Sequence, residues 1–283
     1  MATALVLEGG AKRGIYTAGV LDVLLEHDIM TDGVVGVSAG AIHGCSYVAK
    51  QLGRSLRYNL KYGNDPRFMS IGNWIKTGNV VDTKFCYHEL PDSLDPFDHN
   101  SFEASNTKFY AVCSNIETGQ AEYIYCKSLR DEKIDYIRAS ASLPFLSQIV
   151  KIDNKKLLDG GICDSIPLKA AQHLGYTKNI VILTRPTGYY KKPSYNGWLA
   201  KLVYRRFPKF VDAIINRHNM YNEQLSYISQ AEKTSDTLVV RPSKHIKIGK
   251  MEHDLNIVQE MYDLGRNDGL AMLDTIKSFI KED

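Results

Sequence analysis

Short apolar runs alternate with segments of helical length along most of the chain, which predicts strands joined by helices. The expected strands lie at residues 4–8, 33–36, 108–114, 122–126, 148–151, 156–158, 179–184 and 237–241. The expected helices lie at residues 16–27, 39–51, 133–140, 166–174 and 256–280. Because the run at 179–184 is very apolar, it is typical of a parallel strand covered on both faces. The pattern predicts an α/β fold of three layers, α/β/α, with a mainly parallel central sheet.

Residues 58–103 interrupt this alternation. They hold aromatic side chains among turn signals, namely Phe68, Trp74, Phe85, Tyr87 and Phe97. We interpret the segment as an insertion between strands, which either covers a functional site or forms a structural layer in which the aromatic side chains are buried. We therefore expect a core at residues 4–175 that includes the insertion. Residues 176–283 are expected to supply the last strands and a mostly helical C-terminal extension packed on the core.

In the C-terminal region, apolar residues recur at helical spacing over residues 198–215, with an interruption at Pro208. Basic residues flank this stripe, namely Lys201, Arg205, Arg206 and Lys209. A basic amphipathic stretch such as 198–211 could contact an anionic membrane surface. More often such a stretch is a helix that packs on its own domain, and the sequence leaves both interpretations open.

Composition narrows the class of protein. The 283 residues are 44% apolar and 24% charged, as in an ordinary soluble globular protein. The net charge of +3 is too small to favour a nucleic-acid partner. The five cysteines lie in apolar or strand-like runs without C-x-x-C spacing, which favours reduced thiols. Residues 1–10 lack a basic region and a long apolar run, so we expect neither a signal peptide nor a membrane span, and we predict a cytoplasmic protein.

The candidate chemistry centres on residues 36–40, GVSAG, which match the pattern G-x-S-x-G. On a sharp turn from strand to helix, this pattern presents a serine hydroxyl for attack on an acyl carbon. An apolar run precedes the motif and a small-residue helix is expected after it, so the required setting is present. Ser38 is therefore the predicted nucleophile. Gly36 and Gly40 are expected to avoid steric clashes at the strained turn.

The loop at residues 9–14, GGAKRG, is the second candidate element. It lies between the first expected strand and helix, where unpaired amides form a site for negative charge. A dinucleotide site requires G-x-G-x-x-G, a phosphate-binding loop requires Gly-Lys before Ser or Thr, and this loop matches neither. We therefore predict an oxyanion hole, because neighbouring parallel strands would bring these amides and Ser38 to the same edge of the sheet.

Three motifs, in this order, resemble those of the patatin-like phospholipase family. They are GGAKRG at 9–14, GVSAG at 36–40, and LLDGG at 157–161, which contains Asp159. The stretches NIETG at 115–119 and RASASLPF at 138–145 also resemble family sequences that precede this aspartate. The resemblance extends over about residues 4–174. It departs from the family at Ala11, where a third glycine is usual, and this puts the geometry of the oxyanion hole in question.

The resemblance implies the mechanism of a bacterial patatin-like serine acyl hydrolase, in which Asp159 accepts the proton of Ser38 and Ser38 forms an acyl-enzyme. The implied oxyanion hole consists of backbone amides drawn from Gly9, Gly10, Ala11 and Ala39. The other motif positions are Arg13, Gly14, Gly36, Gly40, Gly160 and Gly161. No cofactor is implied, and no histidine or cysteine cluster has metal-ligand spacing.

Residue order alone does not identify the base. His43 follows Ser38 by five residues on one expected helix, which directs it away from the hydroxyl. A histidine after the acid could still complete a triad, and the candidates are His173, His218, His245 and His253. The resemblance instead implies a dyad of Ser38 and Asp159.

We expect the protein to cleave acyl esters of lipids and to be cytoplasmic, and peripheral membrane contact through about residues 198–211 is left open. The alternatives are a general carboxylesterase or acyltransferase acting on small esters, a non-catalytic acyl-lipid binder, and a nucleotide-binding α/β protein that uses the loop at 9–14. The sequence leaves the oligomeric state open.

Overall fold

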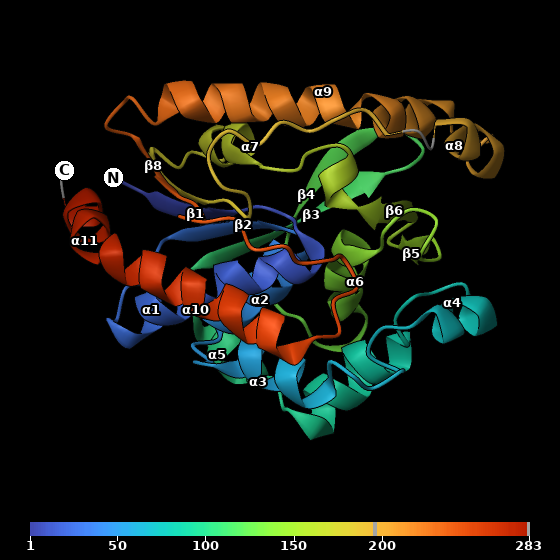
Figure 1. Cartoon of the computed structure of the whole chain (residues 1–283), viewed down its shortest axis with the longest axis horizontal. Helices are drawn as coiled ribbons and strands as arrows, with labels where there is room; N and C mark the ends of the chain where they lie inside the picture. Colours follow the sequence, from blue (N-terminus) through green and yellow to red (C-terminus); the bar gives the residue numbers. More distant parts are fainter. Residues whose placement is uncertain (195–196, 282–283) are drawn as a thin grey trace.

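A central sheet of eight strands lies between two helical layers in the computed structural model, which describes residues 1–194 and 197–281 (Figure 1). The strands are β1 (Thr3–Leu7), β2 (Gly33–Val37), β3 (Lys108–Asn115), β4 (Gln120–Tyr125), β5 (Val150–Ile152), β6 (Lys155–Asp159), β7 (Lys178–Ile182) and β8 (Thr237–Val240). Their order is β5-β6-β3-β2-β1-β7-β8, and β4 also pairs with β3. All neighbours from β3 to β8 along this order are parallel, which confirms the predicted fold class.

The helices cover both faces of this sheet. They are α1 (Ile15–Glu26), α2 (Ala39–Val48), α3 (Arg54–Tyr62), α4 (Ile71–Thr77), α5 (His99–Ala104), α6 (Asp135–Ala141), α7 (Leu168–His173), α8 (Gly197–Val203), α9 (Pro208–Ala231), α10 (Leu255–Ala271) and α11 (Leu273–Lys281). Helices α7 and α9 lie on one face, and α1, α2 and α10 lie on the other (Figure 1). Each face of the sheet has its own hydrophobic core, and alternate residues of β1 pack into the two cores. Leu5 and Leu7 pack into one core, and Ala4 and Val6 pack into the other.

Several boundaries differ from the predicted ones. The helix expected at 256–280 is divided at Met272 into α10 and α11, and the helix expected at 39–51 ends at Val48. The insertion is largely helical, since it contains α3, α4, a π-helical segment at Phe85–Leu94 and α5. Pro208 is the first residue of α9, a position where the missing amide hydrogen costs no helical bond. Residues 282–283 of the expected extension lie outside the described part of the chain, and the division near residue 175 stays a prediction.

Strand β3 brings two distant parts of the chain together. Its partner β4 pairs with Tyr110–Asn115 along one edge. The other edge pairs first with β2, where Val37 lies opposite Val112, and then with β6, where Asp159 lies opposite Cys113. Because Val112 and Cys113 are consecutive, the end of β2 and the end of β6 meet at one point on β3. The residue after Val37 is Ser38, so the register itself places Ser38 beside Asp159.

The C-terminal helix α10 packs closely on α1. A Cβ atom at Gly265 would lie 2.1 Å from the carbonyl oxygen of Tyr16, and one at Gly19 would lie 2.2 Å from the carbonyl oxygen of Tyr262. Only glycine allows two helical backbones to approach this closely. The hydroxyl of Tyr262 also donates to Asp22 on α1 at 2.6 Å. The C-terminal region is therefore part of the core packing.

We predict that Gly265→Ala lowers the free energy of unfolding by about 2 kcal/mol, because the added methyl group has to push α10 away from α1. Urea denaturation measures this change. The matched control is Gly72→Ala in α4, where the nearest atom to the added Cβ is the Ser70 Oγ at 3.7 Å. The control should leave stability unchanged or raise it slightly. Equal stability of both variants would contradict the close packing of α1 and α10.

Candidate active site

Ser38 occupies a strained turn between β2 and α2. Its backbone has φ 54° and ψ −118°, in a region that residues with a side chain rarely adopt. Glycines on either side permit the turn: a Cβ at Gly40 would lie 2.5 Å from the Leu7 carbonyl oxygen. The Ser38 amide donates to the Ser140 Oγ at 2.8 Å, and that hydroxyl donates to the Val112 carbonyl at 2.6 Å. The predicted elbow is therefore present and is held by a hydrogen bond from α6.

Asp159 accepts a hydrogen bond from Ser38. The Ser38 Oγ lies 2.7 Å from the Asp159 Oδ2, and the Gly161 amide donates to the Asp159 Oδ1 at 2.8 Å. The carboxylate is buried, and burial raises the pKa of Asp159 above its usual value. The nearby Arg217 guanidinium opposes this shift, as do the hydrogen bonds from Ser38 and Gly161. The result is a buried carboxylate with a raised pKa in contact with the serine hydroxyl, which is suited to accept its proton.

The histidines lie elsewhere. His43 Nδ1 is 3.0 Å from the Ser55 Oγ, and burial together with Lys12 lowers the pKa of His43 to about 3, so this ring is neutral. His218 Nδ1 is 3.1 Å from the Ile215 carbonyl oxygen. Over residues 1–194 and 197–281, no histidine makes a hydrogen bond to Ser38 or Asp159. The geometry therefore pairs Ser38 with the carboxylate.

The loop at residues 9–14 lies against Ser38. A Cβ at Gly9 would be 3.2 Å from the Ser38 Cβ, and one at Gly14 would be 2.4 Å from the Ala39 Cβ. Among the described residues, the backbone amides of Gly10, Ala11 and Ala39 donate no hydrogen bond. The Gly9 amide, by contrast, donates to the Ser165 carbonyl at 3.4 Å. Gly9 thus packs against Ser38 while its amide contacts Ser165, and its contribution to an oxyanion hole stays a prediction.

Three motif positions, Ala11, Gly160 and Arg13, have distinct surroundings. Ala11 has φ 48°, a left-handed conformation in which glycine is favoured, so the alanine adopts the backbone that a glycine would. A Cβ at Gly160 would lie 2.1 Å from the Val112 carbonyl oxygen, so Gly160 allows the turn after Asp159 to pack on β3. Arg13, in contrast, has a buried Nε that no group among the described residues accepts from.

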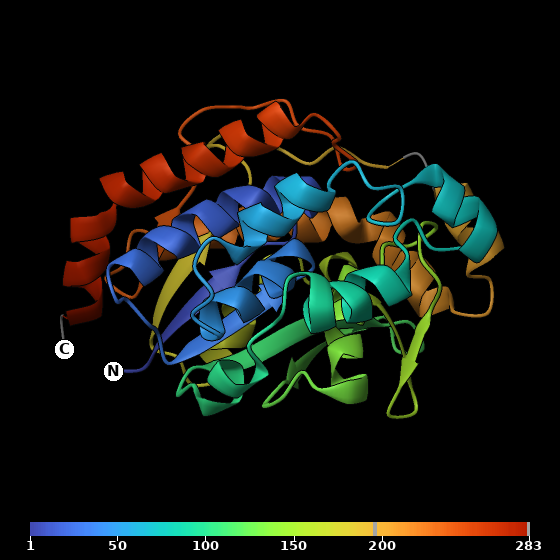
Figure 2. The same cartoon turned by 90° about the horizontal axis from the view of Figure 1, so that it is seen from below.

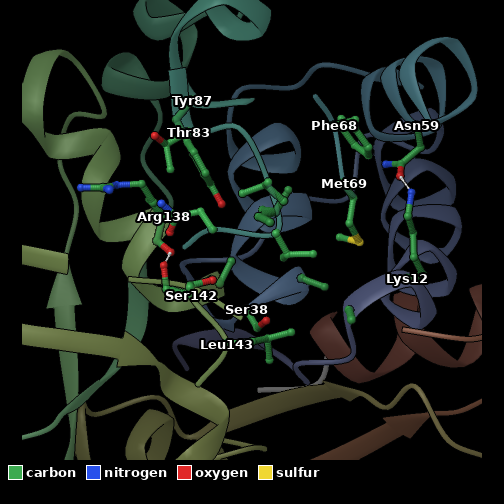
Figure 3. Close-up of a pocket in the computed structure, with 18 of the residues that line it drawn as sticks. Lys12, Ser38, Asn59, Phe68, Met69, Thr83, Tyr87, Arg138, Ser142 and Leu143 are labelled. Atoms are coloured by element: carbon green, nitrogen blue, oxygen red, sulfur yellow. Dashed lines mark hydrogen bonds between the residues drawn. The ribbon is translucent and has the colours of Figure 1, made fainter. Parts of the chain in front are cut away.

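An apolar cavity opens beside Ser38 (Figure 3). It has a volume of about 130 Å³, and a second cavity of about 150 Å³ adjoins it. The two share the side chains Ile42, Tyr58, Phe68, Met69, Val81 and Tyr87. Five of these six lie within the insertion at 58–103, which therefore forms walls of the cavities as well as buried structure. Adjoining apolar spaces of this kind are suited to a hydrocarbon chain.

Lys12 places a polar group on the wall of the first cavity (Figure 3). Its ammonium donates to the Asn59 Oδ1 at 3.0 Å and lies 4.7 Å from the centre of the Phe68 ring. Burial lowers the pKa of Lys12 to about 8. The described residues contain no group of three or more side chains suited to hold a metal ion. They also include no helix with the length and apolar character needed to cross a bilayer.

The fold and the elbow define a class, the α/β proteins that carry a serine on a strand-to-helix turn. The chain belongs to the patatin-like phospholipase family, whose model matches residues 5–171. A second model, described as a domain of unknown function (DUF6363), matches residues 207–281.

Relatives of known sequence extend this comparison. The chain is 26% identical to the uncharacterized protein YjjU of Escherichia coli over 289 residues, which covers 99% of this chain and 79% of that one. It is 25% identical to lysophospholipase NTE1 of Cryptococcus neoformans over 260 residues, covering 85% of this chain and 15% of that one. The chain thus spans a small part of that lysophospholipase. The structure of VipD from Legionella pneumophila aligns with a TM-score of 0.48 at 11% identity, over 97% of this chain and 67% of that one.

Sequence reasoning missed three contributors to the site. Ser140 lies inside the RASASLPF stretch, but its bond to the Ser38 amide joins residues 102 positions apart. Arg217 on α9 donates through Nε to the Gly161 carbonyl, next to Asp159. The cavity wall at Leu143 follows α6. No local pattern marks such contacts, because each depends on how distant elements pack.

We predict that Asp159→Asn does not lower the melting temperature. Because the pKa of Asp159 is raised in the folded protein, the folded state binds this proton more tightly than the unfolded state, so the charged form lowers stability at neutral pH. The neutral amide removes that cost. Thermal unfolding at pH 7 measures the effect.

The matched control is Asp95→Asn, which removes another buried carboxylate. Asp95 binds Arg57 through two bonds of 2.6 and 2.9 Å and lies 3.3 Å from Arg54, which is buried. Its loss should cost about 3 kcal/mol, because a buried guanidinium is left without its counter-charge. A melting temperature for Asp159→Asn that falls as far as that for Asp95→Asn would contradict the account of Asp159.

Proposed function

We propose that this protein is a serine acyl hydrolase that cleaves acyl esters of lipids, with Ser38 as nucleophile and Asp159 as proton acceptor. The observation that carries the proposal is the 2.7 Å hydrogen bond from the Ser38 hydroxyl to the buried Asp159 carboxylate, at the mouth of an apolar cavity. The relationship to patatin-like phospholipases supports a lipid substrate. The lysophospholipases among its relatives are named for activity on the same class of ester.

The reaction runs in two stages. The Ser38 Oγ attacks the carbonyl carbon of the ester while its proton passes to Asp159, and the tetrahedral intermediate carries a negative oxygen. The amides of Gly10, Ala11 and Ala39 would stabilise that oxygen, since they have no other acceptor among the described residues. The carbon–oxygen bond to the alcohol then breaks, and the alcohol leaves with the proton from Asp159. Water repeats these steps on the acyl-enzyme and releases the acid.

The two adjoining cavities support a placement of the substrate. An acyl chain bound in these cavities lies among Phe68, Met69 and Tyr87, and its carbonyl end lies at Ser38. The insertion is fixed in this position by a hydrogen bond of 2.8 Å from the Trp74 indole to the Phe145 carbonyl. The insertion therefore both shapes the acyl site and is held to the loop that follows α6.

We predict that Ser38→Ala and Asp159→Asn each lower kcat on a soluble acyl ester by at least about 10³-fold, because nucleophile and base act as a unit. Activity should be lost as pH falls through the raised pKa of Asp159. The midpoint of this loss in kcat/KM should therefore lie above about pH 4, the ordinary pKa of an aspartate side chain. Steady-state kinetics across pH measure both effects.

The controls are exposed histidines, His173→Ala, His245→Ala and His253→Ala. They should retain turnover. The dyad would be wrong if one folded histidine variant were as inactive as Ser38→Ala while Asp159→Asn kept substantial turnover. That result would indicate a triad with the histidine as base. Hydrolysis undiminished in Ser38→Ala would remove the proposed nucleophile.

We further propose that the protein works at a lipid surface through α8 and α4. On α8, Trp198 is 69% exposed, and on α4, Ile75 is 72% exposed. Figure 1 and Figure 2 show these two helices at the same end of the molecule. Both are tied to Phe145, since its amide donates to the Tyr204 hydroxyl at 3.1 Å and its carbonyl accepts from Trp74.

The charges around α8 fit an anionic surface. Lys201, Arg205 and Arg206 are exposed, and the ion pairs of the described residues include none of them. Exposed aromatic and aliphatic side chains beside basic ones are typical of helices that lie in a membrane interface. The predicted stretch 198–211 thus has an exposed part and a buried part. Helix α8 is exposed, whereas Phe210 and Val211 at the start of α9 are buried.

We predict that Arg205→Glu with Arg206→Glu abolishes sedimentation with vesicles that contain phosphatidylserine at low salt, since each basic residue near the surface contributes about 1 kcal/mol. Turnover of a short soluble ester should persist. The matched control reverses two exposed basic charges elsewhere, Lys233→Glu with Lys247→Glu. Equal vesicle binding by both double variants would contradict the proposed surface, and loss of soluble-ester turnover in the first would make these residues structural.

A further inference from the structure

A further pocket, lined with basic side chains, shares the side chain of Leu143 with the acyl cavity. It has a volume of about 480 Å³. Its apolar walls include Phe145, Ile162 and Ile214. Its charged walls are all basic: Lys191, Lys192, Arg217 and Lys250. Among the residues that the structure describes, none of those lining this pocket is acidic.

The basic groups there outnumber the nearby acidic groups, Glu8 and Asp159. None of Lys191, Arg217 and Lys250 takes part in an ion pair among the described residues, and the guanidinium Nε atoms of Arg13 and Arg185 are buried without partners. Burial and the neighbouring charges of Arg217, Arg13 and Lys250 together lower the pKa of Lys191 to about 8, and Glu8 opposes this shift. Burial, Arg217 and Arg13 also lower the pKa of Lys250, and the charge of Asp159 opposes this shift.

The two acids nearby are already engaged. Glu8 accepts hydrogen bonds from the Tyr221 hydroxyl at 2.6 Å and from the Thr184 amide at 2.5 Å. Asp159 accepts from Ser38 and Gly161. The charges of these two acids offset part of the positive charge. The remaining like charges repel each other in a partly buried pocket unless a further anion sits between them. The pocket is therefore built to receive negative charge from outside the chain.

The position of Arg217 connects this pocket to the reacting centre. Its Nε donates to the Gly161 carbonyl. A Cβ atom added at Gly161 would lie 3.2 Å from the Arg217 Nη2, so the guanidinium packs directly on this glycine. Figure 3 shows Leu143, the shared wall, beside Ser38. An ester carbonyl at Ser38 would thus lie near Leu143, the side chain that lines both the acyl cavity and the basic pocket.

We propose that Lys191, Arg217 and Lys250 form an anion subsite that binds the phosphate of the lipid head group whose acyl ester is cleaved at Ser38. The proposal rests on the proposed function for the placement of the ester. Ammonium and guanidinium groups bind phosphate oxygens through charge-assisted hydrogen bonds, and the planar guanidinium can bind two of them at once. The substrate class is therefore a phosphate-bearing lipid rather than a neutral glyceride.

The test compares two esters with one acyl chain, 1-oleoyl lysophosphatidate and 1-oleoylglycerol. In Lys191→Met with Lys250→Met, the ratio of kcat/KM for the phosphate ester to that for the neutral ester should fall by about tenfold or more, chiefly through KM. The matched control, Lys233→Met with Lys247→Met, removes two exposed charges outside the pocket and should keep the ratio. An unchanged ratio in the first double variant would overturn the subsite.

A binding measurement separates this proposal from the catalytic one. Ser38→Ala protein should bind lysophosphatidate more tightly than oleoylglycerol in calorimetry, and the lysine double substitution should remove the difference even if no ester is ever hydrolysed. Inorganic phosphate is the third probe. Should phosphate alone bind as tightly as lysophosphatidate, the pocket would be a site for free phosphate and the assignment to a lipid head group would be wrong. Equal affinity for lysophosphatidate, oleoylglycerol and inorganic phosphate would show that the pocket is not an anion subsite.

Discussion

The pairing of two strands on one edge of β3 is the constraint on which the rest of the site depends. Strand β2 ends opposite Val112 and β6 ends opposite Cys113, so Ser38 and Asp159 meet although 121 positions separate them. A slip of either strand along β3 would separate the hydroxyl from the carboxylate. The close contact of Gly160 with the Val112 carbonyl keeps the turn after Asp159 at this point.

The site is held in a conformation that the chain would not adopt on its own. Ser38 has a positive φ, and Asp159 is a buried carboxylate whose pKa is raised by burial. Both features cost folding free energy, and the surrounding packing has to offset that cost. The bond from the Ser38 amide to Ser140 and the contact between α1 and α10 are two of the interactions that do so. The C-terminal region contributes two of these supporting contacts. Helix α10 packs on α1, and Arg217 on α9 donates to the Gly161 carbonyl.

Much of this arrangement could be predicted from sequence because its signals are local. The apolar runs marked the strands, and the G-x-S-x-G motif between a strand and a helix marked the elbow at Ser38. Asp159 came from the resemblance to a family, since no local pattern distinguishes it from an ordinary turn. The roles of Ser140, the Gly9 amide and the basic pocket were not predictable, because each depends on contacts between distant elements. The helices of the insertion were missed because turn residues and aromatics obscured a helical period.

The measurement that tests the central claim most directly is the intact mass of the protein after reaction with a long-chain alkyl fluorophosphonate, followed by peptide mapping. The account predicts one adduct, located on Ser38, which is absent from Ser38→Ala and forms much more slowly in Asp159→Asn because the hydroxyl has lost its proton acceptor. An adduct located on another residue, or one that forms equally fast in Asp159→Asn, would contradict the pairing of Ser38 with Asp159 as the reactive centre.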